Sequence, residues 1–147
     1  MRPVDELGVD LLRRGERLRI KTRGSSMTPF LRDGDTAVVS PVVVTNVKVG
    51  DVICYEAPAG KLFVHRVIAR EADGFVAKGD ALTIRERVHR TAVVGTVTAI
   101  ERDGRLRTLD SRAARWRSRS IAALAPLLPH ALAAAVSLKR LLRGRRA

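Results

Sequence analysis

Short β-prone runs separated by glycine–aspartate turns fill most of the chain, and no other feature constrains its fold as strongly. Between Leu18 and Leu109 the runs alternate apolar and polar residues, as strands with one buried face do. Asp73-Gly74 and Asp103-Gly104 are typical of tight hairpin turns. Short strands at this spacing favour antiparallel pairing. The sequence therefore predicts a mainly β fold, a curled antiparallel sheet or small barrel.

The same pattern places the individual strands. We predict strands at residues 18–22, 36–40, 52–56, 61–70, 75–78, 91–100 and 105–109. Residues 42–47 are β-prone but follow Pro41, so this segment is either a loop or an edge strand. In the strand at 61–70, alternate residues face opposite sides: Leu62, Val64, Arg66 and Ile68 on one face, and Phe63, His65 and Val67 on the other.

The two ends of the chain have a helical pattern. Residues 4–14 carry an apolar stripe and end at Gly15, which predicts a short N-terminal helix. From Ser111 onward the chain is rich in Arg, Ala and Leu, and we expect helix there except near two prolines. A length of 147 residues suits one hydrophobic core. We therefore expect a catalytic body at 1–110 and a basic helical tail at 111–147.

Composition narrows the core and the chemistry. With three Phe, one Tyr and one Trp, the core must be mainly aliphatic. The single cysteine, Cys54, excludes an internal disulfide and reads as a small buried hydrophobic residue within a strand. The three histidines and the cysteine have no metal-ligand spacing, and no glycine-rich phosphate loop is present. We expect neither a metal nor a cofactor.

The net charge of +13 is concentrated in the tail. Residues 111–147 hold nine Lys or Arg and no acid, whereas the other 110 residues have a net charge of +4. An uncharged run at 121–138 lies between basic clusters, which favours a membrane partner. Its 18 residues are at the lower limit for a span, so surface contact and a span both stay open. With Trp116 as its one aromatic residue, the tail is not expected to bind nucleic acid.

The N-terminus contains no apolar run of the kind found in secretory signals. With the basic tail, this predicts localisation at the cell membrane through the tail, and otherwise in the cytoplasm.

Three stretches supply the residue types of serine hydrolysis. Ser26 lies in the flexible turn Gly24-Ser25-Ser26, His65 in a strand, and Asp80 and Glu86 follow the next strand. A serine needs an adjacent base, and histidine with a reference pKa of about 6.5 is mostly neutral at pH 7. An acid that orients the histidine completes such a set, and Asp80 and Glu86 are both candidates.

Each of these residues also has a structural explanation. Ser26 can be a simple turn residue, His65 a buried strand residue, and Asp80 a turn residue bonded to its own backbone. Glu86 lies between two arginines and can form a surface ion pair. His89 is a rival base. If the site is real, the backbone N–H groups of Ser25 and Ser26 are the candidate oxyanion hole.

Six motifs in order resemble the superfamily that unites type I signal peptidases with LexA-type self-cleaving proteins. The resemblance covers about residues 17–100. The motifs are Gly24-Ser-Ser-Met-Thr-Pro, Gly34-Asp35-x-x-Val-Val, Val49-Gly50-Asp51-Val52-Ile, Val64-His65-Arg66-Val67-Ile, Lys78-Gly79-Asp80 and Val94-Gly95-x-Val97.

The resemblance implies roles for particular residues. Ser26, directly before Met27, would be the nucleophile, and His65 the base. Histidine at that place resembles the endoplasmic-reticulum, archaeal and some Gram-positive signal peptidases, whereas the other bacterial ones and the LexA-type proteins have lysine. Asp80 matches the first acid of the histidine enzymes, and Glu86 stands where they have a second aspartate.

Two departures from signal peptidases accompany the resemblance. Gly24 stands where they usually have a serine that contributes to the oxyanion hole. Their N-terminal membrane helix has no counterpart, and we expect that the run at 121–138 replaces it.

Three functions are compatible with these residues. The first is a serine endopeptidase of signal-peptidase type that cleaves a presequence or precursor peptide after small residues. The second is a processing peptidase dedicated to one peptide produced alongside it. The third is a non-catalytic module that binds a membrane or nucleic acid through its tail.

Overall fold

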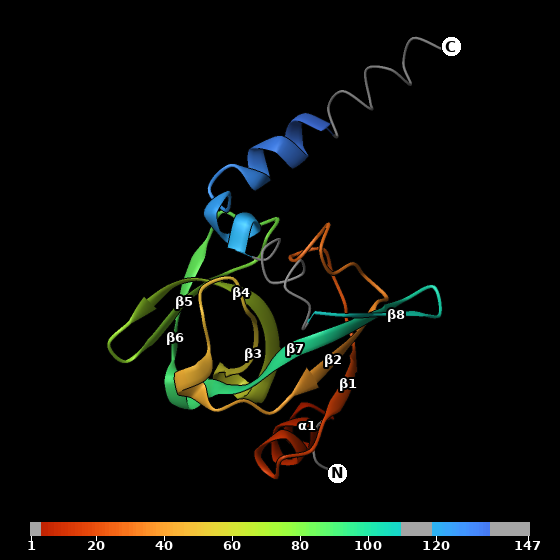
Figure 1. Cartoon of the computed structure of the whole chain (residues 1–147), viewed down its shortest axis with the longest axis vertical. Coiled ribbons are helices and arrows are strands. Elements are labelled where there is room, and N and C mark those ends of the chain that lie inside the picture. Colours follow the sequence, from red (N-terminus) through yellow and green to blue (C-terminus); the bar gives the residue numbers. More distant parts are fainter. Residues whose placement is uncertain (1–3, 110–118, 136–147) are drawn as a thin grey trace.

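Within the part of the chain that the structure describes, eight strands form one antiparallel sheet that does not close into a barrel (Figure 1). The computed structural model describes residues 4–109 and 119–135. The sheet has the order β1-β2-β7-β3-β4-β5-β6, and β8 pairs with β7. The strands are β1 (Leu18–Lys21), β2 (Thr36–Ser40), β3 (Val52–Ala57), β4 (Lys61–Glu71), β5 (Gly74–Lys78), β6 (Arg85–His89), β7 (Val93–Arg102) and β8 (Arg105–Thr108). The mainly β antiparallel fold is thus confirmed.

The predicted strand positions agree with the structure at seven of these eight elements, and β6 is the exception. Its residues include two arginines and a glutamate, and Val88 is its one buried side chain. Backbone pairing with β5 holds it in place, from Gly74 opposite His89 to Lys78 opposite Arg85. Apolar alternation therefore gives no signal for β6. The segment at 42–47 contains a 3-10 helix, η1 (Val44–Asn46), rather than an edge strand.

The core is aliphatic, as predicted, and consists of two clusters. Helix α1 (Val4–Arg13) ends near the predicted position and buries Val9 and Leu12 in the first cluster, with residues from β2, β3 and β7. The second cluster lies around β3, β4 and β5 and includes Tyr55 and Phe75. Between them the clusters bury both faces of β3, which lies near the centre of the sheet. A central strand with both faces buried is a rigid support for residues of a site.

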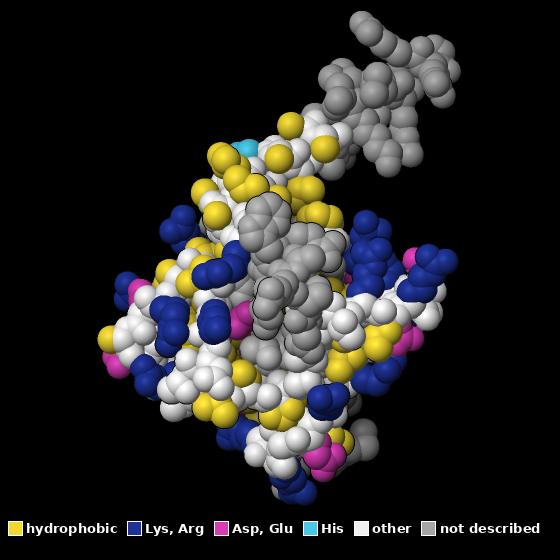
Figure 2. All heavy atoms as spheres, viewed as in Figure 1, with side chains coloured by type: hydrophobic (Ala, Val, Ile, Leu, Met, Phe, Trp, Pro, Cys, Tyr) yellow, Lys and Arg dark blue, Asp and Glu magenta, His cyan; other side chains and the backbone are white. Residues whose placement is uncertain are grey.

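The C-terminal segment packs on the body before it extends away. Residues 119–123 and 128–135 are helical, with a turn at 124–127. Ala122 and Ala125 are buried, and the buried Lys78 ammonium donates to the carbonyl of Ala125. Figure 2 shows hydrophobic side chains gathered over this segment.

The apolar run predicted at 121–138 is therefore broken by a turn. Within residues 4–109 and 119–135, no helix is long and apolar enough to cross a bilayer, so a span is not supported there. Residues 136–138 lie outside the described part of the chain.

Candidate active site

Ser26 lies in the connection between β1 and β2 and is partly exposed. Its carbonyl accepts a hydrogen bond from the N–H of Ala81, 2.9 Å away, in the loop after β5. That loop approaches closely, since a Cβ atom at Gly79 would lie 2.6 Å from the Ser26 carbonyl oxygen. Such an approach requires glycine. The Gly79-Asp80 motif thus packs directly against the backbone of Ser26.

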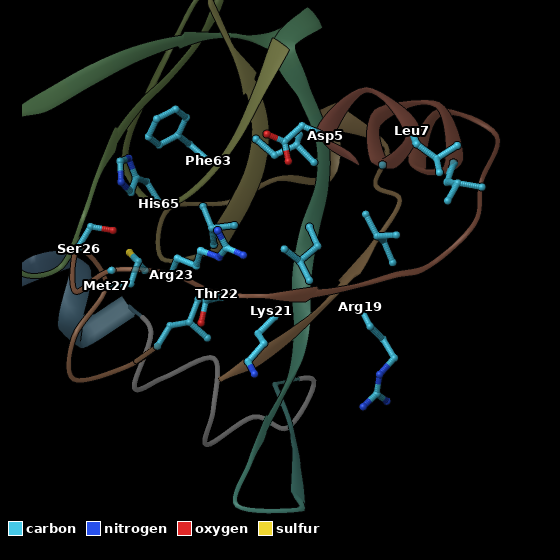
Figure 3. A pocket seen from close by; sticks show the side chains of 18 residues that line it. Asp5, Leu7, Arg19, Lys21, Thr22, Arg23, Ser26, Met27, Phe63 and His65 are labelled. Atoms are coloured by element: carbon cyan, nitrogen blue, oxygen red, sulfur yellow. The ribbon is translucent and has the colours of Figure 1, made fainter. Parts of the chain in front are cut away.

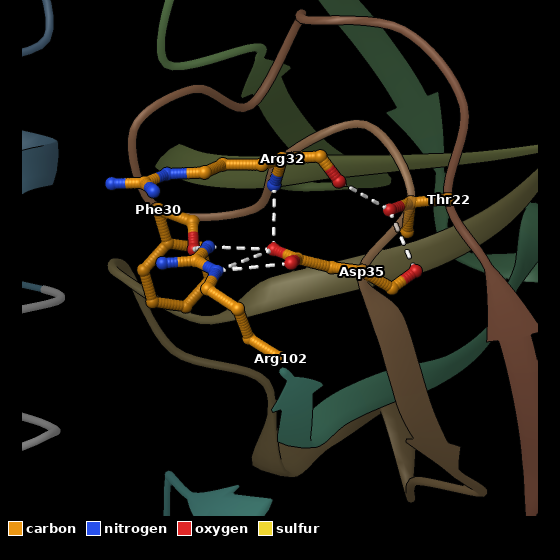
Figure 4. A network of polar contacts seen from close by, with 5 residues as sticks. All are labelled: Thr22, Phe30, Arg32, Asp35 and Arg102. Carbon is orange, nitrogen blue, oxygen red and sulfur yellow. Dashed lines mark hydrogen bonds and ion pairs between the residues drawn. The ribbon is translucent and has the colours of Figure 1, made fainter. Parts of the chain in front are cut away.

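An ion pair fixes the other end of the Ser26 connection (Figure 4). The buried carboxylate of Asp35 accepts from Arg102 Nη2 at 2.6 Å and from the backbone N–H of Arg32 at 2.7 Å. Arg102 also donates to the carbonyl of Phe30. The Thr22 hydroxyl oxygen lies 2.7 Å from the carbonyl oxygen of Arg32 and 3.0 Å from that of Asp35, within hydrogen-bond distance of both. The Arg102 guanidinium holds the pKa of Asp35 below its usual value of 3.8. The turn after Ser26 is therefore anchored to β7.

Ser26 and His65 line the same pocket, which has a volume of about 710 Å³ (Figure 3). The wall of the pocket is formed by α1, by β1 with the residues that follow it, and by residues 62–65 of β4. Its lining includes the buried, apolar Met27 and the basic side chains of Lys21 and Arg23. The structure thus brings the predicted nucleophile and base to one cavity, from segments 39 residues apart in the chain.

The Nδ1 atom of His65 contacts two polar groups. It lies 2.9 Å from the hydroxyl of Tyr55 and 3.3 Å from Oε2 of Glu86, and the Tyr55 hydroxyl donates to the same Glu86 oxygen. His65 is 4% exposed. Burial lowers the pKa of His65 from its usual 6.5, and Glu86 acts in the opposite direction. His65 is therefore poised as a neutral imidazole at pH 7.

Asp80, a candidate partner of His65 in the sequence, pairs with Arg66 instead. Its two carboxylate oxygens accept from Nε and Nη2 of Arg66, each at 2.8 Å. Both side chains are buried, and Arg66 also donates to the carbonyl of Gly50 and stacks over the Phe30 ring. Of the two candidate acids, Glu86 is thus the one in contact with His65. Asp80 instead contributes to the framework beneath the Ser26 connection.

The backbone N–H groups of Ser25 and Ser26, the candidate oxyanion donors, are available to a bound substrate. Within the described residues, the backbone N–H groups of Ser25 and Ser26 donate no hydrogen bond to the protein. Gly24 precedes them with a φ of +85°, a left-handed conformation that a serine would adopt only under strain. Its own N–H donates to Asp33. The glycine at this place therefore fits the local backbone.

The other reactive side chains lie away from the pocket. His89 is exposed on β6, where its Nδ1 lies 2.8 Å from the Thr91 hydroxyl. Cys54 is buried in the core, and burial raises the pKa of its thiol to about 12. In residues 4–109 and 119–135, no cluster of His, Cys, Asp or Glu could hold a metal ion.

Tyr55 is a residue of this site that the sequence reasoning missed. It is 4% exposed and lies opposite Phe63 in the β3–β4 pair, while His65 lies opposite Ile53. Tyr55 and His65 are therefore diagonal neighbours on one face. Counting outward from the predicted hairpin at 57–60 would have found this pair, because an antiparallel hairpin fixes its register.

Comparison with known proteins identifies the family of the chain. Searches of curated proteins and of solved structures found no significant match. A family model described as "Signal peptidase, peptidase S26" matches residues 16–122. That region contains the Ser26 connection, His65 and both candidate acids. The match extends over more than half of the chain and supports a signal-peptidase type of protease, which the six ordered motifs predicted; the chain belongs to the signal peptidase S26 family.

Proposed function

We propose that the chain is a serine endopeptidase in which Ser26 is the nucleophile and His65 the general base. One observation carries this proposal: Ser26 and His65 line the same pocket, while the Nδ1 side of the imidazole is occupied by Tyr55 and Glu86. Contacts on Nδ1 leave Nε2 as the proton acceptor, which is the arrangement that a serine nucleophile requires. With histidine as the base, the chain would be similar to the endoplasmic-reticulum and archaeal branch of signal peptidases.

The reaction follows from these roles. The Ser26 Oγ attacks the scissile carbonyl carbon while His65 takes the hydroxyl proton. The N–H groups of Ser25 and Ser26 stabilise the resulting oxyanion. The C–N bond then breaks, His65 returns the proton to the leaving amine, and water hydrolyses the acyl-enzyme by the reverse roles. Glu86 stabilises the imidazolium that forms transiently. Asp80 acts by position, since its loop holds the carbonyl of Ser26.

The substrate that fits the pocket is an extended peptide. Within the described residues, β1 pairs with β2 on one side alone, and residues 61–65 of β4 pair only with β3. Both free edges belong to segments that line the pocket. A peptide can add to such an edge through backbone hydrogen bonds. We propose a presequence or precursor peptide with small residues before the scissile bond as the substrate.

Substitution of the two central residues tests the mechanism. A quenched fluorescent presequence peptide with alanine before the scissile bond serves as the probe. We expect Ser26→Ala to lower kcat by at least about a thousandfold, as loss of a serine nucleophile does. His65→Ala should have a comparable effect, and the matched control His89→Ala should not, because His89 lies outside the pocket. Cleavage that survives in Ser26→Ala would overturn the proposal.

A panel of substrates distinguishes a general from a dedicated peptidase. If the chain processes many precursors, presequence peptides of different origin should be cleaved at similar rates. Cleavage of a single precursor encoded beside it, with none of the general presequences, would identify a dedicated processing peptidase.

We further propose that the C-terminal segment contacts a membrane surface. Family membership favours a membrane location, and exposed apolar side chains lie on and beside this segment, at Leu124, Leu127, Leu82 and Ile84. The contact of Lys78 with Ala125 places the segment next to the β5–β6 loop (Figures 1 and 2). Flotation of the full chain with anionic vesicles should decrease when Leu124 and Leu127 are replaced by serine. Unchanged flotation would exclude this surface.

A further inference from the structure

We propose that Tyr55 is a positioning residue for the reaction, whose hydroxyl fixes His65 as the tautomer protonated on Nδ1 and holds Glu86 beside it. This inference rests on the proposed Ser26–His65 mechanism. Tyr55 is not among the residues that line the pocket, so it acts through His65 rather than on the substrate.

The strands determine where the Tyr55 hydroxyl lies. β3 and β4 pair in continuous antiparallel register from Val52 opposite Arg66 to Ala57 opposite Lys61. The Tyr55 ring packs against its neighbours on the same face, with ring centroids 6.2 Å from Phe63 and 5.9 Å from His65. Because the ring is buried on a central strand, its hydroxyl has little freedom to leave Nδ1.

Counting hydrogens assigns the tautomer. A phenol has one hydrogen to donate, and Tyr55 donates it to Oε2 of Glu86. Burial, and then the bond to Glu86, raises the pKa of Tyr55, so the phenol keeps that hydrogen. Toward Nδ1 of His65, 2.9 Å away, the Tyr55 oxygen can therefore only accept. Nδ1 must carry a proton, and the lone pair is on Nε2.

Glu86 alone is a poor anchor for the ring. Its side chain is 47% exposed and lies on β6 between Arg85 and Arg87. Its carboxylate is 3.3 Å from Nδ1, longer than the usual hydrogen bond of 2.7–3.2 Å. An exposed carboxylate can turn toward water or a neighbouring arginine, and the Tyr55 hydroxyl holds it in place. The phenol thus links a half-exposed acid to a buried imidazole.

Removing the phenol oxygen tests this role in the full chain. Tyr55→Phe removes the hydrogen bonds of the phenol oxygen with both His65 and Glu86. We expect kcat on the presequence peptide to fall about tenfold, with KM unchanged because Tyr55 does not line the pocket. Thr98→Val is the matched control, because it deletes a partly buried hydroxyl that bonds to Ser40, away from His65. Its kcat should equal that of the wild type. A Tyr55→Phe enzyme with unchanged kcat would overturn the proposal.

A double-mutant cycle tests whether Tyr55 acts through Glu86. If it does, Tyr55→Phe and Glu86→Gln together should slow the reaction little more than the slower single variant, because both remove the same constraint. Multiplicative effects of the two substitutions would show independent roles and refute the link.

The pH profile adds a readout that a purely structural residue would not move. Burial lowers the pKa of His65, whereas the charges of Glu86 and Asp80 raise it. In Glu86→Gln the acidic limb of kcat/KM should move to lower pH, because the group that raises the His65 pKa most is lost. An acidic limb at the wild-type position would contradict the role assigned to Glu86.

The tautomer can be measured without any cleavage. We expect the ¹⁵N spectrum of the labelled wild-type protein at pH 7.5 to show His65 protonated on Nδ1, with the signals assigned by comparison with His65→Ala. In the double variant the phenol oxygen is lost and the Glu86 carboxylate becomes a neutral amide, a weaker acceptor, so His65 should shift toward the Nε2-protonated form. A wild-type ring protonated on Nε2 would overturn the inference. If Ser26→Ala retained cleavage, the proposed function would fail, but the spectrum would still decide the tautomer.

Discussion

Asp80 is the residue whose substitution best separates a structural from a chemical role in this site. Asp80→Asn keeps the shape of the side chain and removes its charge. The Arg66 guanidinium, which is wholly buried, then loses its counter-ion and one of two 2.8 Å hydrogen bonds. Leaving a buried charge uncompensated costs about 3–5 kcal/mol. Because the carbonyl of the introduced amide, the Gly50 carbonyl and the Phe30 ring still contact Arg66, we expect a loss near the lower limit, about 3 kcal/mol.

Urea denaturation followed by circular dichroism measures this loss. For a chain of this length, about 3 kcal/mol corresponds to a fall in Tm of roughly 10 °C. The matched control is Glu86→Gln, which should change the free energy of unfolding by less than about 1 kcal/mol because the side chain is half exposed. Replacing the pair together, Arg66→Met with Asp80→Leu, should be less destabilising than Asp80→Asn, since no buried charge remains.

The two acids should therefore have opposite signatures. Asp80→Asn should lower stability and lower kcat by disturbing the Ser26 backbone, with the acidic limb of the pH profile nearly in place. Glu86→Gln should move that limb and leave stability almost unchanged. If Asp80→Asn were as stable as the wild type but inactive, Asp80 would act on the chemistry of His65. The assignment of Asp80 to the framework would then be wrong.

Three further predictions follow from burial and close contact. The value of kcat/KM should fall as pH decreases through the pKa of His65, with a midpoint below 6.5, because burial disfavours the imidazolium. The free energy of unfolding should also decrease as pH falls below 6.5, because the unfolded chain then binds a proton at His65 more readily than the folded protein. Cys54 should resist a thiol reagent such as DTNB at pH 8 until the protein is unfolded in urea, because its pKa is about 12 and its exposure is zero. Gly79→Ala should lower kcat at least about tenfold, because the added Cβ would displace the Ser26 carbonyl. Gly95→Ala is the matched control, since its Cβ would lie equally close, at 2.6 Å, to the carbonyl of Ser40. It should lower stability but leave the kcat of the folded protein unchanged.

The sequence was most informative where local patterns agree with the tertiary fold. Apolar alternation and Asp-Gly turns located β5 and β8. The ordered motifs identified Ser26 and His65 as a candidate pair, and both line one pocket. It was least informative at β6, whose five residues carry one buried side chain and are held by backbone pairing. Without β6, the position of Glu86 could not be predicted. The choice between Asp80 and Glu86 depended on the side of β4 that each acid reaches, and strand alternation alone does not give that.

The dipeptide His65-Arg66 connects the two halves of the site. Consecutive residues of a strand point to opposite faces, so one face of β4 presents His65 to Tyr55 and Glu86, and the other presents Arg66 to Asp80. Through Asp80 the second face supports the loop that bonds to the Ser26 carbonyl. A shift of β4 by one residue would exchange the two faces and disrupt the contacts of His65 and the support of the Ser26 connection at once. In the proposed mechanism, the motif Val64-His65-Arg66 therefore holds the proposed base and the support of the proposed nucleophile in adjacent positions, and a substitution at Arg66 tests the support without removing the base.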